Sequence, residues 1–288
     1  MTGEKQSAPR PGLYVVGTPI GNLEDITLRA LRVLKEVDLI ACEDTRQTQK
    51  LLTHFSISTR TVSYHEHNES ERAAELVEQM QQGASVALVT DAGMPAVSDP
   101  GYRLIARAIE NELPVVPVPG PSAFLTALVA SGLPTDSFGF RGFLPSKTGE
   151  RRTMLQEIRN TPTAQIFYEA PHRIIDALHD IVEILGAARQ IVIARELTKL
   201  HEEFLRGKAG EVSQILERRG AVRGEITLLI AKADATESRV ETPSLTTRER
   251  VQQIMAAERV DEKAALKKAA KERGISKSEA YRQMQRDK

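Results

Sequence analysis

The sequence SVALVTDAGMPAVSDPG, residues 85–101, is the stretch around which the rest of the chain is organised. Residues 85–90 are apolar or β-branched, which is typical of a buried strand. Eleven residues with two glycines and two prolines follow, and residues 102–113 then have the pattern of a helix. Strand-to-helix connections usually have about two to six residues. The longer loop favours a ligand site, with Asp91 and Ser98 facing a crevice; a plain connection is the alternative.

The same succession of strand and helix recurs through the first half of the chain. Apolar strands are predicted at residues 13–17, 38–41, 61–64 and 115–118. Helical spacing follows each of them, and Asn68 with Glu71 has capping-box spacing at the start of one helix. Strands that alternate with helices indicate a parallel sheet with helices on both faces, so the fold class is α/β.

Composition limits the function classes. The 288 residues hold 39 Lys and Arg against 39 Asp and Glu, so no global charge attracts nucleic acid or membrane. The single cysteine, Cys42, excludes an internal disulfide and fits a reducing cytoplasm. Residues 1–12 are polar, unlike a signal peptide, and no run of apolar residues is long enough to cross a bilayer. We expect a cytoplasmic protein without a membrane segment.

Charged residues come directly after the strand at residues 38–41. They are Glu43, Asp44 and Arg46. Asp44 can cap the following helix, whereas Arg46 can bind a phosphate. Both interpretations stay open at this point.

Two histidines follow the strand at residues 61–64. In a continued strand, His65 and His67 would share one face, which suggests a metal site; no third ligand follows nearby. With Asn68 they could instead form part of a polar substrate pocket. A further loop, residues 119–123, follows the strand at 115–118 and holds Ser122, which can cap the next helix.

In the second half of the chain, strands are predicted at residues 137–144, 165–168, 190–194 and 225–231. Charged residues again come directly after two of these strands. Glu169 and Glu196 are carboxylates that could act as a base. Arg173, Arg195 and Lys199 could hold phosphate. A surface ion-pair network is the alternative interpretation of these five residues.

The end of the chain differs in charge from the rest. Residues 234–247 read as a linker, and residues 248–288 as helices. Residues 240–288 hold twelve Lys and Arg against eight Asp and Glu, a net charge of +4. Two short helices around Gly274 resemble a helix-turn-helix, for which nucleic acid is the natural partner. A solvated amphipathic tail or a dimer strap is the alternative.

Three loops taken together resemble the tetrapyrrole-methylase superfamily of S-adenosylmethionine enzymes. They are VVGTPIGNL (15–23), DAGMPAVSDPG (91–101) and PGPSA (119–123). Four more motifs resemble the ribosomal RNA small subunit methyltransferase I family, which methylates a cytidine ribose 2′-oxygen in 16S rRNA. These are ACEDTR (41–46), YHEHN (64–68), FYEAPHR (167–173) and ARELTKLHEE (194–203). The resemblance covers residues 13–231, and the basic tail fits the same family.

This resemblance implies a homodimer of chains with two α/β domains, residues 13–120 and 121–234, and a cofactor cleft between them. Residues 240–288 would add a basic helical tail that binds RNA. The residues carried over as holding S-adenosylmethionine are Pro19, Asp91, Ala92, Gly93, Pro95, Ser122, Ala123, Tyr168, Leu197 and Ile226. The turn Asp91-Ala92-Gly93 departs from the commoner Gly-Asp-Pro turn of the superfamily, which leaves the detailed contacts open.

The implied chemistry needs a ribose oxygen aligned behind the methyl group, exclusion of water and a proton acceptor. It needs no metal, because the sulfonium carbon is already electrophilic. The candidate acceptors are Glu43, Asp44, His65, Glu169 and Glu196. The candidate substrate-binding residues are Arg46, His67, Asn68, His172, Arg173, Arg195, Lys199, Lys267, Lys268, Lys271 and Arg282. The partner would be 16S rRNA, free or in the small ribosomal subunit. Two rival functions are methylation of a tetrapyrrole or protein side chain, and a non-enzymatic RNA-binding assembly factor.

Overall fold

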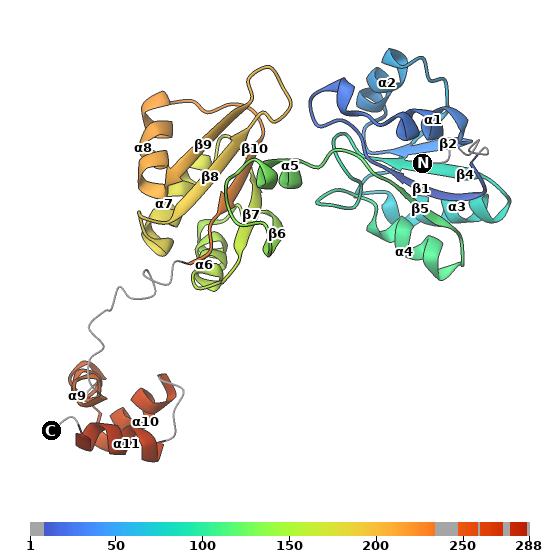
Figure 1. Cartoon of the computed structure of the whole chain (residues 1–288). Helices are drawn as coiled ribbons and strands as arrows, with labels where there is room; N and C mark the ends of the chain where they lie inside the picture. Colours follow the sequence, from blue (N-terminus) through green and yellow to red (C-terminus); the bar gives the residue numbers. More distant parts are fainter. Residues whose placement is uncertain (1–8, 234–246, 259, 273–276, 287–288) are drawn as a thin grey trace. The chain divides into compact units, whose positions relative to one another are not determined.

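The structure is a computed structural model that describes residues 9–233, 247–258, 260–272 and 277–286 (Figure 1). Its internal contacts divide the chain into two compact units, Met1–Ala233 and Asp234–Lys288. The first unit holds two five-stranded sheets, and the second is helical. The linker predicted at residues 234–247 lies almost wholly outside the described residues.

The first sheet is parallel throughout, with strand order β3-β2-β4-β1-β5. Its strands are β1 (Gly12–Val16), β2 (Leu39–Cys42), β3 (Thr61–Ser63), β4 (Ser85–Val89) and β5 (Val115–Val118). β4 is the central strand, and all five of its residues are buried. The stretch that organises the sequence therefore also forms the middle of this sheet.

Helices cover both faces of the first sheet (Figure 1), which confirms the predicted architecture. The 3-10 turn η1 (Leu23–Asp25) precedes α1 (Leu28–Glu36), which packs with α2 (Thr45–His54) on one face. On the other face lie α3 (Glu69–Gln81) and α4 (Tyr102–Glu110). Thr27 caps α1 by accepting a hydrogen bond from the Ala30 N–H at 3.0 Å, as its residue type favours.

Two local predictions in this half are wrong. Asn68 occupies the position before α3 but makes no side-chain cap. Its amide turns back instead, accepting from the His65 N–H at 2.9 Å and donating to the Ser63 carbonyl at 3.2 Å. The helix predicted at residues 102–113 ends at Glu110, because Glu112 adopts a left-handed backbone with φ 56°.

The second sheet is mixed, with strand order β6-β7-β10-β8-β9. Its strands are β6 (Phe138–Phe143), β7 (Ala164–Glu169), β8 (Gln190–Arg195), β9 (Glu203–Lys208) and β10 (Ile226–Ile230). β6 and β7 are parallel, whereas β10 runs antiparallel to both β7 and β8. β9 was not predicted from the sequence, because its charged residues do not read as a strand.

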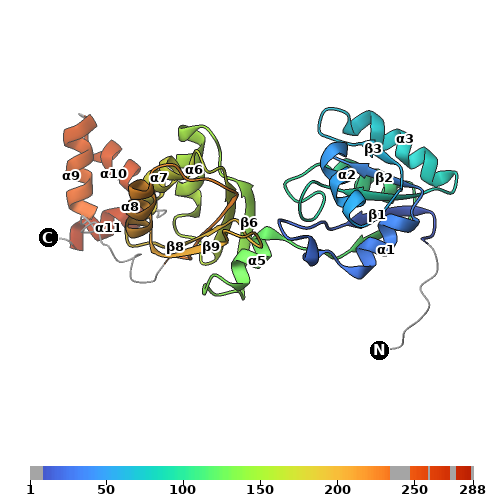
Figure 2. The ribbon, with the colours of Figure 1, turned by 90° about the horizontal axis from the view of Figure 1, so that it is seen from above.

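One face of the second sheet is covered by α6 (Thr148–Ile158), α7 (Ile174–Leu185) and α8 (Ala209–Arg219), as Figure 2 shows. The opposite face packs against α5 (Ala123–Val129), through Ala127 and Leu128. The helix α5 follows directly on β5, so the chain passes from one sheet to the other at residues 119–122.

The second unit contains α9 (Thr247–Glu258), α10 (Glu262–Glu272) and α11 (Lys277–Arg286). They enclose a small apolar core that includes Val251, Ile254, Leu266 and Met284. The helical prediction is confirmed for these residues, but the turn around Gly274 lies outside the described part of the chain. Within the described residues, no helix is long and apolar enough to span a membrane.

Candidate functional site

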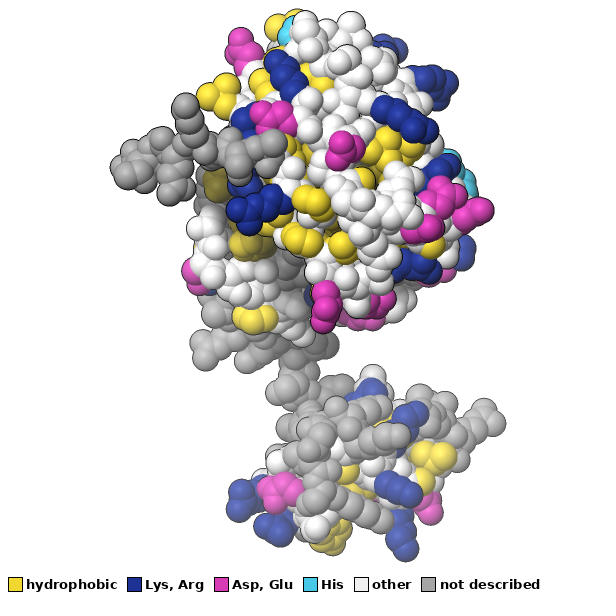
Figure 3. All heavy atoms as spheres, turned by 90° about the vertical axis from the view of Figure 1, so that its right-hand side faces the viewer, with side chains coloured by type: hydrophobic (Ala, Val, Ile, Leu, Met, Phe, Trp, Pro, Cys, Tyr) yellow, Lys and Arg dark blue, Asp and Glu magenta, His cyan; other side chains and the backbone are white. Residues whose placement is uncertain are grey.

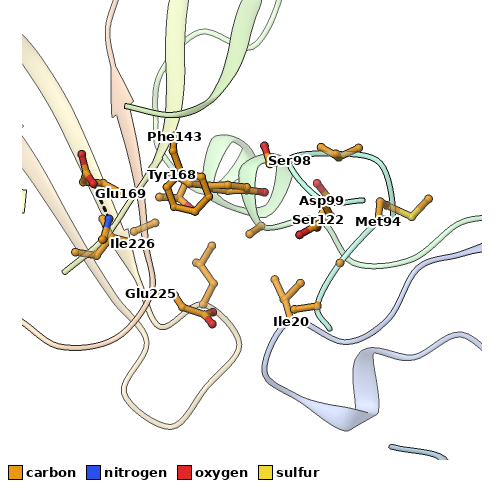
Figure 4. Close-up of a pocket in the computed structure, with 18 of the residues that line it drawn as sticks. Ile20, Met94, Ser98, Asp99, Ser122, Phe143, Tyr168, Glu169, Glu225 and Ile226 are labelled. Atoms are coloured by element: carbon orange, nitrogen blue, oxygen red, sulfur yellow. Dashed lines mark hydrogen bonds between the residues drawn. The ribbon is translucent and has the colours of Figure 1, made fainter. Parts of the chain in front are cut away.

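A cavity of about 350 Å³ lies at the carboxyl end of β4 and is lined by residues from both sheets of the first unit (Figure 4). From the first half come Ile20, Ala92, Gly93, Met94, Val97, Ser98 and Asp99. The start of α5 contributes Ser122 and Ala123. From the second half come Phe143, Tyr168, Glu169, Ala170, Pro171, Ala194, Leu197, Glu225, Ile226 and Thr227.

Backbone contacts between the three glycine-containing loops shape the first side of the cavity. Thr18 and Gly93 exchange two main-chain hydrogen bonds, of 2.9 and 3.1 Å. The Thr18 hydroxyl also donates to the Thr90 carbonyl at 3.0 Å. Gly17 and Gly120 approach so closely that a Cβ on Gly120 would lie 2.7 Å from the Gly17 Cα. The loops after β1, β4 and β5 thus meet at one edge of the sheet.

The loop of residues 91–101 is held in an unusual conformation. Ala96 and Ser98 have φ angles of 66° and 65°, in the left-handed region that non-glycine residues rarely adopt. The Ala96 N–H donates to the Pro100 carbonyl at 3.3 Å, which closes the loop on itself. Non-glycine residues in this region cluster at ligand sites, where the surrounding structure enforces the conformation.

Seven of the ten residues expected to hold the cofactor line this cavity. They are Ala92, Gly93, Ser122, Ala123, Tyr168, Leu197 and Ile226. Pro19, Asp91 and Pro95 are not among the lining residues. Asp91 is exposed, and its Oδ1 accepts a hydrogen bond from the Asp44 N–H at 3.3 Å.

Asp44 caps α2, because its Oδ1 accepts from the Arg46 N–H at 2.8 Å. The Arg46 guanidinium also binds this carboxylate, at 2.9 and 3.1 Å. The hydrogen bonds from Arg46 lower the pKa of Asp44 to about 2. The Arg46 side chain is 87% exposed, so it also remains accessible to solvent. The neighbouring Glu43 accepts from the buried Thr90 hydroxyl at 3.1 Å.

Asp99 lines the cavity, although it is not among the site residues expected from the sequence. The pKa of Asp99 is raised to about 6, mainly by burial and to a smaller extent by the nearby negative charge of Glu43. The signal that could have found Asp99 is its place in the SDPG segment of the cavity loop, beside the predicted Ser98. Ser98, Asp99 and Ser122 lie on one side of the cavity, opposite Tyr168 and Ile226 (Figure 4).

Aromatic residues form the wall on the second side. Phe140 and Phe143 contact Tyr168 with ring centroids 5.0 and 5.6 Å apart, and Phe124 stacks on Phe140 at 4.4 Å. Burial raises the pKa of Tyr168 to about 12, so its hydroxyl stays protonated at neutral pH. Phe143 is 55% exposed, at the rim of this group.

The charged residues after β7 are paired with each other. Glu169 is buried, and its Oε1 accepts from the Ala170 N–H at 2.7 Å (dashed in Figure 4) and from Arg173 Nε at 2.8 Å. Arg173 is thereby held beside the cavity wall, whereas His172 is exposed. Glu169 is the one expected proton acceptor that lines the cavity.

The charged residues after β8 are paired as well. Lys199 Nζ lies 3.0 Å from both Glu196 Oε1 and Glu225 Oε2. Glu196 also accepts from the Glu225 N–H at 2.9 Å, and this bond lowers the pKa of Glu196. Arg195 Nε lies 3.2 Å from Glu203 Oε2. These contacts match the ion-pair alternative of the sequence reasoning, and none of Arg195, Glu196 and Lys199 lines the cavity.

His65 and His67 do not share a strand face, because β3 already ends at Ser63. Both lie in the turn before α3, with ring centroids 5.9 Å apart, and neither lines the cavity. In the part of the chain that the structure describes, no group of three or more His, Cys, Asp or Glu side chains is placed to hold a metal ion.

The basic residues expected on the tail lie on two of its helices. Lys267 and Lys268 are exposed on α10, and Arg282 is exposed on α11. Figure 3 shows Lys and Arg side chains on the surface of this unit. Lys271 belongs to α10, but its side chain lies outside the described residues.

The chain is similar to known proteins over most of its length. The family model of the Tetrapyrrole (Corrin/Porphyrin) Methylases matches residues 12–213. The chain is 48% identical over 273 residues to Ribosomal RNA small subunit methyltransferase I of Halalkalibacterium halodurans. This alignment covers 93% of each of the two chains. It is 45% identical over 287 residues to the protein of the same name from Mesorhizobium japonicum, in an alignment that covers 99% of this chain and 96% of that one.

Solved structures share the fold at low sequence identity. Diphthine synthase superposes with a TM-score of 0.59 and 15% identity, over 78% of this chain and 92% of that one. Uroporphyrin-III C-methyl transferase from Thermus thermophilus, solved in complex with S-adenyl homocysteine, gives a TM-score of 0.53 and 20% identity. That match covers 76% of this chain and 97% of the Thermus chain.

Proposed function

The chain belongs to the tetrapyrrole methylase family and, within it, to the ribosomal RNA small subunit methyltransferase I group, and we propose that it transfers a methyl group from S-adenosylmethionine to the 2′-oxygen of a cytidine ribose in 16S rRNA. The observation that carries this proposal is the 48% and 45% identity to two rRNA methyltransferases over 93% and 99% of this chain. The second of these alignments covers 99% of this chain and so includes the basic tail.

The cavity fits the proposed cofactor. Its volume of about 350 Å³ is in the range of small-molecule sites, roughly 300–1,000 Å³. Ile20, Leu197 and Ile226 supply apolar contact for a nucleoside and a methionine chain, and Ser98 and Ser122 supply hydrogen-bonding groups. When bound, S-adenosylmethionine supplies an electrophilic methyl group, so the site needs no metal. The cofactor complex of the Thermus relative supports this placement by analogy of fold.

The protein's own contribution is to position the two reactants and keep water out. The hydrogen bonds between Thr18 and Gly93 and the close approach of Gly17 to Gly120 make the first wall rigid. The aromatic group around Tyr168 makes the second wall apolar. A rigid, largely apolar site favours a reactive alignment of the ribose oxygen behind the methyl group.

RNA binding is assigned to exposed cations. Arg46 lies on the first unit at the start of α2. Lys267, Lys268 and Arg282 lie on the tail. Cations that contact phosphates supply most of the sequence-independent affinity for nucleic acid. We also propose that the chain is a homodimer; the exposed Leu125, Val129 and Phe138, on α5 and β6, offer an apolar surface for it.

The test is transfer of a labelled methyl group by the purified chain. Small subunits and free 16S rRNA, both lacking the modification, are incubated with labelled S-adenosylmethionine, and the RNA is digested for mass spectrometry. We expect label in one 2′-O-methylcytidine. Reactions with a tetrapyrrole acceptor and with a protein extract serve as the comparison. Label in either of these, with none in RNA, would assign the chain to another substrate class.

A further inference from the structure

An exposed phenylalanine lies on the wall of the cavity. The Phe143 side chain lines the cavity, and the residue is 55% exposed, beside Tyr168 in Figure 4. In the part of the chain that the structure describes, the other exposed Phe and Tyr residues are Tyr102, Phe138 and Tyr281, and none of these lines the cavity. A large apolar ring that remains in water at a ligand site is stabilised when a ligand covers it.

A β-bulge turns this ring toward the cavity. In β6, Phe140 pairs with Ile166 of β7. Phe143 pairs with Tyr168, so three steps along β6 match two steps along β7. Side chains alternate between the faces of a strand, so without the extra residue Phe140 and Phe143 would point to opposite faces. With the extra residue both rings contact Tyr168, at 5.0 and 5.6 Å. Bulges next to active sites re-aim side chains in this way.

The backbone on both sides of Phe143 is fixed. Gly142 has a φ of 69°, and a Cβ there would lie 3.1 Å from Ser98 Oγ, so the bulge lies against the cavity loop. Leu144 is buried in the core beside α6 and α7, and its N–H donates to the Tyr168 carbonyl at 3.3 Å. The ring is therefore held in place before any ligand binds, which lowers the entropy cost of binding.

The rim of the cavity differs from its interior. Ile20, Leu197 and Ile226 are buried and line the interior, where they suit the cofactor. Phe143 is at the rim, where the second reactant of a methyl transfer must enter. In a nucleotide the base is bonded to C1′ of the ribose, and C1′ is adjacent to the C2′ that carries the accepting oxygen. A ribose aligned with the methyl group therefore brings its own base to the cavity rim.

We propose that Phe143 binds the RNA substrate: its ring stacks on the base of the nucleotide whose ribose is methylated, and holds that nucleotide at the mouth of the cavity, turned out of the RNA stack. This inference rests on the proposed function. Aromatic side chains bind unstacked RNA bases in this way. Every base has a π face, so the ring positions the nucleotide and does not select cytosine. Tyr168 supports the ring from the side, with an angle of 64° between the two rings.

The experiment is single-turnover methyl transfer to unmodified small subunits, with the full chain in excess and S-adenosylmethionine saturating. Several enzyme concentrations give the maximal rate and the half-saturating concentration. Phe143→Ala should lower their ratio by about 5–150-fold, which is the effect of losing one base–aromatic stack. Phe143→Leu keeps an apolar side chain without a π face and should fall nearly as far. Phe143→Tyr keeps the ring and should stay within about threefold of the unsubstituted protein.

Two further measurements separate RNA binding from other roles of the ring. Calorimetry should give the Phe143→Ala protein an S-adenosylmethionine affinity within about threefold of the unsubstituted protein, because the interior of the cavity is kept. Sedimentation velocity should show an unchanged oligomeric state. Tyr102→Ala removes an exposed ring that does not line the cavity, so it is the matched control and should keep the unsubstituted rate.

The outcomes distinguish this inference from its alternatives. A Phe143→Leu protein as active as Phe143→Tyr would overturn it, because a π face would then not matter. A rate that falls in proportion to cofactor affinity would make Phe143 a cofactor contact, and a changed oligomeric state would place the ring between two copies of the chain; either result overturns the inference and leaves the proposed function standing. If Phe143→Ala does not fold, the comparison of Leu with Tyr still decides. No RNA methylation by the unsubstituted protein would overturn the proposed function itself.

Discussion

The main-chain N–H of Asp44 donates a hydrogen bond to Oδ1 of Asp91 at 3.3 Å, which joins the loops after β2 and β4. Asp91 is exposed and lies outside the cavity lining, although Ala92 and Gly93 directly after it belong to that lining. The carboxylate of Asp91 therefore anchors the first residue of the cavity loop to the start of α2.

Removal of this anchor should weaken cofactor binding indirectly. A hydrogen bond to a charged group is worth about 1.5–3 kcal/mol, and exposure to solvent brings this toward the lower value. We expect Asp91→Ala to lower S-adenosylmethionine affinity by about tenfold, measured by calorimetry, with the melting curve nearly unchanged. Asp91→Asn keeps an acceptor oxygen and should lose less. Equal affinities in all three proteins would show that the bond to Asp44 does not position the loop.

The contact between Gly17 and Gly120 gives a second prediction. A Cβ on Gly120 would lie 2.7 Å from the Gly17 Cα, which is backbone and cannot move aside cheaply. We expect Gly120→Ala to lower the melting temperature by several degrees and to weaken cofactor binding, because the loops after β1 and β5 must separate. Gly149→Ala in α6 is the control: no atom lies within 4 Å of the new Cβ, and alanine favours a helix. A Gly120→Ala protein as stable as this control would contradict the role of the contact.

Much of the first half of the fold was predictable because three of its strands, β1, β2 and β4, are buried along their whole length and therefore read as apolar runs. β4 and β5 appear where their apolar runs predict them, and the Gly- and Pro-rich loops mark the carboxyl ends of the strands. A parallel sheet brings those ends to one edge, so loops that are far apart in sequence meet there. Family resemblance added Tyr168, Leu197 and Ile226, which no local pattern could have joined to that edge.

The remaining features depend on tertiary contacts that the sequence does not display. β9 is missed because its pairing with β8 overrides the low strand preference of residues such as Glu203 and Lys208. The amide of Asn68 finds partners in the preceding turn, so the capping box does not form. Asp99 was missed because its burial in the cavity and its nearness to Glu43, which together raise its pKa, arise only when the loops after β2 and β4 meet in the folded chain.

Asp38 gives a prediction for the pH dependence of stability. Its Oδ2 accepts from the Ser85 N–H at 2.8 Å and from the Ser85 hydroxyl at 2.7 Å, and these bonds lower its pKa. Because the pKa is lower in the folded state, the stabilisation is present above the unfolded pKa of about 3.9 and is lost as the pH falls. In urea titrations, Asp38→Ala should cost about 1 kcal/mol at pH 7, with less difference below pH 4. A difference independent of pH would exclude the ionised carboxylate as its cause.

The basic tail gives a prediction for RNA affinity. Residues 240–288 carry a net charge of +4, so the remainder of the chain is net negative and should repel RNA at long range. The first unit has its own cores and ends at Ala233, whose N–H donates to the Thr161 carbonyl at 3.2 Å. Deletion of the segment from Asp234 onward should therefore leave cofactor affinity nearly unchanged, as measured by calorimetry.

The same deletion should weaken RNA binding and make its salt dependence shallower. Each phosphate contact that is lost removes about 0.7–0.9 from the slope of log affinity against log salt. Replacing Lys267, Lys268 and Arg282 with glutamine should reproduce part of this change while all three helices are kept, which separates charge from shape. If the tail instead braces a dimer, the truncated chain would be monomeric in sedimentation equilibrium and would lose cofactor affinity as well. A truncated chain that binds RNA with unchanged strength and slope would exclude the tail as an RNA-binding element.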